Sequence, residues 1–160
     1  IFSTARSVRG SVPSTRAGVA VQTAKGLLNR LADAKPDVVV AELGDGILGE
    51  YGVQDILADS ELRAAAGAWV VAAPDPVGSW GAVELLRKQY GIAVTALTGP
   101  ATDNEVGLDY IRAALGLPAH NARRDAAGLL QVVLATLRAG RPDFAGRPVV
   151  ETQPPLEATP

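Results

Sequence analysis

The chain has 160 residues, 48% of them apolar and 20% charged, with a formal net charge of −2. This size and composition are typical of one soluble globular domain, and the charge disfavours nucleic acid and anionic membrane surfaces as partners. No apolar run approaches the ~20 residues of a transmembrane helix, and no secretory signal is visible, so we expect a cytoplasmic protein. The absence of cysteine excludes disulfides and thiolate chemistry, and the single histidine excludes a His-rich metal site.

The two ends of the chain differ from its middle. Position 1 is Ile and the chain contains no Met, so we expect a processed chain or the carboxyl-terminal part of a longer protein. The first sixteen residues are small and polar, with three Arg and no acid. From residue 141 onward the sequence RPDFAGRPVVETQPPLEATP is rich in proline and has no apolar period. We therefore predict a single α/β domain over residues 1–140 and a Pro-rich tail over 141–160.

The middle of the chain repeats one rhythm, in which an apolar run is followed by a turn and then by a segment of helical period. The first helix is predicted over 17–34, ahead of strands at 37–41, 68–73, 92–97 and 117–120. Strands that alternate with helices require βαβ crossovers and a parallel sheet. Because the strands are almost entirely apolar, both faces of the sheet are expected to be covered. The predicted fold is a three-layer α/β domain, Rossmann-like or P-loop-like, with a mostly parallel sheet and helices on both faces.

Glycines and short polar residues predict where these helices begin and end. Three predicted helices end at a glycine, namely Gly91, Gly116 and Gly140. We expect each glycine to take the left-handed conformation that terminates a helix. Thr102 and Glu105 match a capping box, and Ser79 is the expected N-cap of its helix.

The loop AELGDGILGEYG, residues 41–52, follows the first predicted strand and combines three carboxylates with four glycines. Open α/β sheets bind ligands outside the carboxyl ends of their strands, where this loop is expected to lie. Carboxylates on a Gly-rich loop suit a hard cation such as Mg²⁺, which usually keeps waters or substrate phosphates as well. We predict Glu42 and Asp45 as metal ligands. The alternative is a surface connection, or a partner surface built on Ile47 and Leu48.

Polar residues after the later strands are candidates for contact with a ligand. Arg16 lies at the start of the first predicted helix, where backbone N–H groups and the helix dipole favour an anion. His120 fits either a hydrogen-bonded structural residue or a catalytic base. The predicted cofactor-binding residues are Asp75, Ser79, Thr102, Asp103, Asn104 and Arg16. For most of them, the alternative is a role in capping a helix or holding a turn.

Three segments, DVVVAELGDG, AWVVAAPDPVGSWGAVELL and IAVTALTGPATDNEVG, together resemble the later half of a dethiobiotin-synthetase-like P-loop domain. The resemblance covers residues 36–122. It implies ATP and Mg²⁺ as cofactors, with Glu42 at the acidic metal-side position. It further places Gly78 and Ser79 at the turn before a helix, and residues 102–104 in the loop that contacts the nucleotide base. The family's phosphate loop, G-x-x-x-x-G-K-[ST], is absent and would lie upstream of residue 1. The alternatives are a degenerate relative that cannot hydrolyse a nucleotide, or an unrelated doubly wound domain.

These observations leave three classes of function open. The first is a ligand-binding domain of a nucleotide-dependent enzyme that uses ATP and Mg²⁺, for example a ligase, synthetase or NTPase. The second is a non-catalytic α/β module that binds a small ligand or a partner chain. The third is part of an NAD(P)-dependent oxidoreductase, although no G-x-G-x-x-G fingerprint is present. The expected partners are a small-molecule or nucleotide ligand, with a homo-oligomer or an N-terminal partner domain left open.

Overall fold

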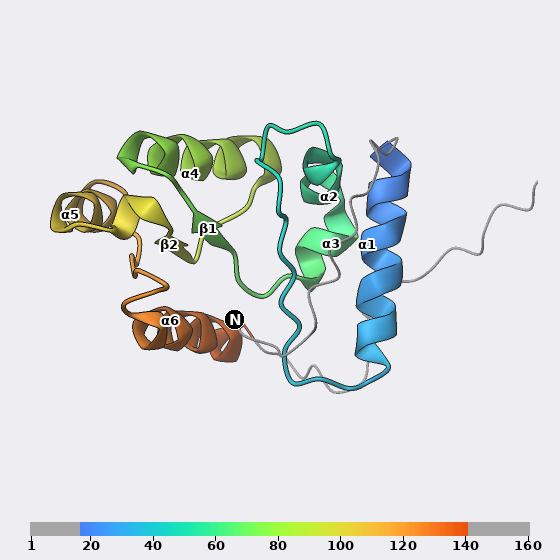
Figure 1. Cartoon of the computed structure of the whole chain (residues 1–160). Coiled ribbons are helices and arrows are strands. Elements are labelled where there is room, and N and C mark those ends of the chain that lie inside the picture. The colour runs from blue at the N-terminus through green and yellow to red at the C-terminus, as the bar shows by residue number, and fades with distance from the viewer. Residues whose placement is uncertain (1–16, 141–160) are drawn as a thin grey trace, which may run out of the picture. The chain divides into compact units, whose positions relative to one another are not determined.

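The computed structural model describes residues 17–140, so Arg16 and the predicted Pro-rich tail lie outside the described residues. The described chain is α/β and divides into two compact units, residues 17–65 and residues 66–140. Figure 1 shows the helices and strands of both units. The prediction of one domain over residues 1–140 stays a prediction. Each unit is described by itself below.

The first unit is helical. It contains α1 (Ala17–Ala32), α2 (Val53–Ala58) and α3 (Ser60–Ala65), and α1 confirms the helix predicted at 17–34. Asp59 separates α2 from α3, because its backbone is extended and its side chain accepts hydrogen bonds from the N–H groups of Glu61 and Leu62. Lys25 of α1 pairs with Asp59 at 3.0 Å and also with Glu61. These ion pairs join the long helix to the two short ones.

The strand predicted at 37–41 is absent from the structure, and this corrects the sequence prediction. No backbone hydrogen bond in the described chain involves residues 36–45. A β-branched run such as DVVV fits a pleated surface, but it becomes a strand only where a neighbouring strand offers hydrogen-bond partners. Val40 is 39% exposed, which also differs from a strand covered on both faces. The acidic loop that follows therefore does not start from a strand end here.

The second unit contains a small parallel sheet. Strands β1 (Val70–Ala72) and β2 (Ala96–Thr98) pair in parallel, and Ala119 adds an isolated parallel bridge to Leu97. The parallel direction is therefore confirmed, and β1 lies within the predicted strand at 68–73. β2 overlaps the predicted strand at 92–97 only at residues 96 and 97, and of the predicted strand at 117–120 only Ala119 forms a bridge. Two paired strands are too few for the three-layer, mostly parallel sheet that the sequence predicts, and the structure supports only the α/β class.

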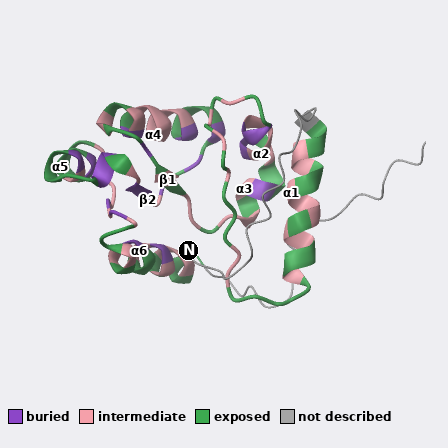
Figure 2. Ribbon diagram, in the orientation of Figure 1, coloured by how far each residue is buried: buried purple, intermediate pink, exposed green. Residues whose placement is uncertain are grey.

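Four helical elements surround this sheet. They are α4 (Pro76–Tyr90), the 3₁₀ turn η1 (Pro100–Thr102), α5 (Glu105–Ala114) and α6 (Ala126–Ala139). In Figure 1, α4 and α6 lie on opposite sides of β1 and β2. Figure 2 shows buried residues of both helices on the sides turned toward the strands. Leu97, Ile111 and Val133 are the largest apolar side chains that are fully buried, and they form the centre of this unit's core.

Three glycines at the ends of these helices are predicted to take the left-handed conformation. Gly91 and Gly116 have φ angles of 66° and 65°, which confirms the left-handed conformation at both. Gly140 has a φ of −86°, so the prediction of a left-handed stop is wrong there. The last turn of α6 closes instead through an ordinary hydrogen bond from Gly140 N to Thr136 O.

The helix starts follow one motif that the sequence analysis missed. The N-caps of α4, α5 and α6 are Asp75, Asn104 and Asp125, and each side chain accepts from the backbone N–H of a glycine three residues on. The repeated pattern is Asx-x-x-Gly, with Gly78, Gly107 and Gly128 at its end. Ser79 is therefore not the cap of α4, and the predicted capping box of Thr102 and Glu105 does not form.

Candidate functional site

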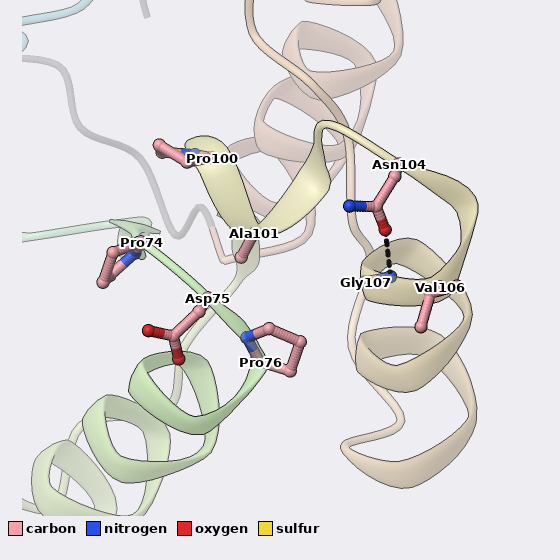
Figure 3. Close-up of a pocket in the computed structure, with 8 residues that line it drawn as sticks. All are labelled: Pro74, Asp75, Pro76, Pro100, Ala101, Asn104, Val106 and Gly107. Atoms are coloured by element: carbon pink, nitrogen blue, oxygen red, sulfur yellow. Dashed lines mark hydrogen bonds between the residues drawn. The ribbon is translucent and has the colours of Figure 1, made fainter.

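A pocket of about 440 Å³ lies in the second unit, between the loops that follow β1 and β2. Figure 3 shows the residues that line it. They are Pro74, Asp75, Pro76, Pro100, Ala101, Asn104, Val106 and Gly107. The volume falls within the range of small-molecule sites, and the position at the carboxyl ends of parallel strands is the usual place for a ligand in such folds.

Backbone contacts hold the two walls of this pocket together. Ala73 N donates to Thr98 O at 3.0 Å, and Ala101 N donates to Ala73 O at 3.0 Å. Gly99 stands between them with a φ of 87°, and a Cβ on Gly99 would lie 2.8 Å from Ala73 O. Only glycine accepts both the positive φ and this close approach. The loops after β1 and β2 are therefore fixed to each other at the base of the pocket.

Asp75 forms the polar part of the β1 wall. One carboxylate oxygen, Oδ1, accepts from Gly78 N at 2.7 Å, and the other makes no hydrogen bond with the described chain. Ser79 is fully buried, and its hydroxyl donates to Asp75 O at 2.9 Å. Of the two predicted contact residues, Asp75 thus lines the pocket, whereas Ser79 secures the first turn of α4 behind it.

Asn104 forms the polar part of the β2 wall. Its Oδ1 accepts from Gly107 N at 2.9 Å, and its amide nitrogen makes no hydrogen bond with the described chain. In Figure 3 this amide nitrogen points toward the Ala101 side of the pocket. Asn104 therefore offers two N–H donors to a ligand. Of the neighbouring candidates, Thr102 is buried, and its hydroxyl donates to Gly99 O at 2.7 Å.

Asp103 belongs to a network centred on Asn121, which the sequence analysis did not select as a site residue. Asn121 is 7% exposed, and its Nδ2 donates to Asp103 Oδ1 at 2.7 Å and to Thr102 O at 3.2 Å. Its Oδ1 accepts from the backbone N–H groups of Arg123 and Arg124. Asn121 therefore connects the loop after Ala119 to the loop after β2, and Asp103 is occupied by this connection rather than directed into the pocket.

His120 and Asp125 form an ion pair or hydrogen bond at the start of α6, with 2.6 Å between His120 Nδ1 and Asp125 Oδ2. The hydrogen bond from His120 is the main cause that lowers the pKa of Asp125, and the N–H of Gly128 adds to it. A Cβ on Gly128 would overlap the His120 ring, so glycine is required for the ring to lie over the first turn. His120 does not line the pocket, and the pair serves to orient the imidazole.

The acidic loop of the first unit contains the predicted metal ligands Glu42 and Asp45. Asp45 Oδ2 is buried and has no hydrogen-bond partner among residues 17–140, whereas Glu42 and Glu50 are exposed. No group of three or more His, Cys, Asp or Glu side chains in the described part of the chain is placed to hold a metal. This loop therefore offers a buried carboxylate oxygen without a described partner, with Glu42 three residues before it. This fits an ion such as Mg²⁺, which takes few protein ligands and completes its shell with water or phosphate.

Within residues 17–140, no helix is long and apolar enough to cross a membrane. Comparison with known proteins adds no assignment, because the chain matches no family model and is similar to no curated protein or solved structure. The resemblance to dethiobiotin-synthetase-like domains stays a prediction.

Proposed function

We propose that this chain binds a nucleotide, ATP together with Mg²⁺, and that the pocket between the β1 and β2 loops receives the base. One observation carries the proposal: a mostly apolar pocket holds a free amide donor from Asn104 and a free carboxylate oxygen from Asp75. Proline, alanine and valine side chains suit the flat faces of a heteroaromatic ring. The two polar groups suit its edge, which for adenine carries both an amine and ring nitrogens.

The charge of the pocket favours the base over the phosphates. Asp75 carries its negative charge at the N-terminus of α4, where it offsets the positive end of the helix dipole. An anionic phosphate is repelled by that carboxylate, whereas an exocyclic amine donates to it. A pocket of this kind selects a ligand with an amine on a planar ring, and this supports adenine over a base that presents a carbonyl at that position.

The proposal assigns Mg²⁺ to Asp45 of the first unit, with Glu42 in support, as a site of its own. When bound, the ion supplies positive charge that attracts anionic groups. The buried and unpartnered oxygen of Asp45 supports this assignment, since such an oxygen is otherwise costly to leave without a partner. The same proposal includes the three-layer, mostly parallel sheet of the sequence analysis, the enzyme class of ATP-dependent ligases, synthetases and NTPases, and a cytoplasmic location.

Calorimetric titration with ATP tests the pocket. Asn104→Asp keeps an oxygen that caps Gly107, replaces the free amide donor with an acceptor and adds a negative charge to the pocket. We expect this variant to bind ATP about tenfold more weakly, because one hydrogen bond is lost and a lone pair faces the ring nitrogen. Asp125→Asn is the control for an exchange at a helix cap, since it makes the reverse exchange at the cap of α6, outside the pocket. Equal affinity in the parent and Asn104→Asp, or no binding at millimolar ATP, contradicts the proposal.

A second titration tests the metal assignment separately. Asp45→Asn and Glu42→Gln keep the side-chain shapes and remove the charges. In a titration with MgCl₂ alone, we expect each variant to bind Mg²⁺ about tenfold more weakly than the parent, because a charged ligand is lost. If all three proteins bind Mg²⁺ equally, or none binds it at millimolar concentration, these residues do not hold the ion, whatever the pocket binds.

A further inference from the structure

The outer edge of β1 carries backbone groups that do not bond to β2. The C=O of Trp69 and the N–H of Ala73 both hydrogen-bond to the β2 side, at 2.7 Å and 3.0 Å. In a strand, the N–H and C=O of one residue point to the same side, and successive residues alternate between the two sides. Val70 and Ala72 therefore point their backbone groups away from β2.

No residue in the range 17–140 satisfies these groups. Within that range, no backbone hydrogen bond outside the β1–β2 ladder involves Val70 or Ala72. Both residues are exposed, Val70 to 38%. β2 differs, because on its other side Leu97 accepts from His120 N and donates to Pro118 O. In the described chain, β1 is therefore an edge strand with free donors and acceptors.

The sequence around β1 does nothing to protect this edge. Soluble proteins usually protect an exposed edge with a charge, a proline or a bulge, because unpaired backbone groups otherwise recruit another strand. No charged residue occurs between Arg63 and Asp75, and β1 itself contains no proline. Helices α4 and α6 lie on opposite sides of the two strands (Figure 1), so the edge is where a further strand can join. These features are typical of an edge that pairs.

We propose that two copies of the chain associate through β1, in antiparallel register about a two-fold axis at Val71. A two-fold axis places identical edge strands in an antiparallel ladder, since this ladder is itself two-fold symmetric. With the axis at Val71, Val70 of each copy lies opposite Ala72 of the other. Such a pair exchanges hydrogen bonds in both directions. The two pairs together use every N–H and C=O that β1 leaves free.

The uncharged edge favours a second copy over an unrelated strand. A two-fold interface places a surface against itself, so a charge near the axis meets its own copy and is repelled. The absence of charge between Arg63 and Asp75 removes this penalty. A sheet of two strands is also marginal, and the dimer joins two of them into one longer sheet. Association stops at two copies, because each β1 edge is then used.

Introduced cysteines test the register, because the chain itself has none. Val71→Cys places two thiols across the axis, where the Cα atoms of a non-hydrogen-bonded pair lie about 4.5 Å apart, within reach of a disulfide. We expect this variant to form a covalent dimer under mild oxidation. Leu130→Cys on α6 is the control for random collision, at a position of 36% exposure. It should crosslink about tenfold more slowly, because its thiols are not held together.

A second substitution tests the hydrogen bonds. Val70→Pro removes an N–H that points away from β2, so the bonds within the β1–β2 ladder stay intact. Sedimentation of the full parent chain should give twice the 16.5 kDa mass of one copy. We expect Val70→Pro to weaken the dimer roughly 30-fold, because each copy loses one donor. Val70→Thr keeps the N–H and the β-branched shape, so it should dimerise as the parent does. Circular dichroism checks that each variant is folded.

Three results overturn the inference. A parent chain that is a monomer at every concentration shows that β1 does not pair with a second copy. Slow hydrogen exchange at the Val70 and Ala72 amides of such a monomer shows that the same chain covers the edge. Equal crosslinking of Val71→Cys and Leu130→Cys shows that any dimer uses another surface. None of these measurements involves ATP, Mg²⁺ or a residue that lines the pocket, so this inference and the proposed function fail separately.

Discussion

Gly107 and the carbonyl oxygen of Ala101 lie so close that a Cβ on Gly107 would overlap this oxygen. Gly107 also donates its N–H to Asn104 Oδ1 at 2.9 Å, so it is held from two sides. The first turn of α5 therefore packs directly against the η1 backbone. This contact fixes the position of the residues after β2 that line the pocket.

We expect Gly107→Ala to destabilise the protein by roughly 2–4 kcal/mol, because backbone cannot move aside as a flexible side chain does. Gly81→Ala is the control within α4, where a Cβ meets nothing within 4 Å. That change should stabilise the protein by about 0.5–1 kcal/mol through helix propensity. Urea denaturation measures both changes. Similar destabilisation by the two substitutions would mean that the contact with Ala101 is not what restricts position 107.

Asn121 is the second position where one side chain supports several loops. We expect Asn121→Ala to destabilise the protein by about 2–3 kcal/mol, since it leaves the N–H groups of Arg123 and Arg124 and the carboxylate of Asp103 without their partner. Thermal unfolding measures the loss. Asp103→Asn, which removes the charge but keeps an oxygen that can accept from Asn121, should cost less than half as much. A smaller effect for Asn121→Ala than for Asp103→Asn contradicts the central role assigned to Asn121.

The pair of His120 and Asp125 predicts a dependence of stability on acid pH. The hydrogen bond from His120 lowers the pKa of Asp125 below its usual value of 3.8 in the folded state. A carboxyl group with a depressed folded pKa contributes stability above its unfolded pKa and loses that contribution as the pH falls through the folded value. We therefore expect the parent to lose more stability than Asp125→Asn between about pH 5 and pH 2.

Melting temperatures of the two proteins across this range provide the measurement. The quantity to compare is the difference in melting temperature between the two proteins at each pH. Asp59 and Glu84 also have lowered pKa values and contribute to the acid unfolding of both proteins. Parallel curves for the parent and Asp125→Asn would show that the pair with His120 adds nothing to acid stability.

The alternation of strands and helices over residues 68–140 could be predicted because each of these elements has a recognisable local sequence pattern. Parts of the apolar runs at 68–73 and 92–97 pair in parallel as predicted, and the glycine at the end of an apolar period predicted the left-handed conformation at Gly91 and Gly116, although not at Gly140. The run at 37–41 has the same composition but forms no strand, since pairing depends on a distant neighbour that composition does not reveal.

The candidate site was predictable in place but not in detail. Asp75 and Asn104 were among the selected residues and line the pocket, whereas Ser79 and Thr102 are buried within the turns. Position along the chain does not tell which of several adjacent polar side chains turns outward. The spacing of Asx and Gly was the available signal, because a side chain that accepts from the residue three positions on identifies the true cap.

The Asx-x-x-Gly motif has a consequence for how this pocket can change over time. Between each cap and its glycine lie two residues, Pro76 and Val77 on α4, and Glu105 and Val106 on α5. Pro76 and Val106 line the pocket but take no part in the capping hydrogen bonds. Part of the apolar lining is thus carried by positions that take no part in anchoring the helix starts. Substitutions at the lining positions can explore new ligands while the helix starts stay in register, so the motif makes the pocket evolvable at little risk to the fold.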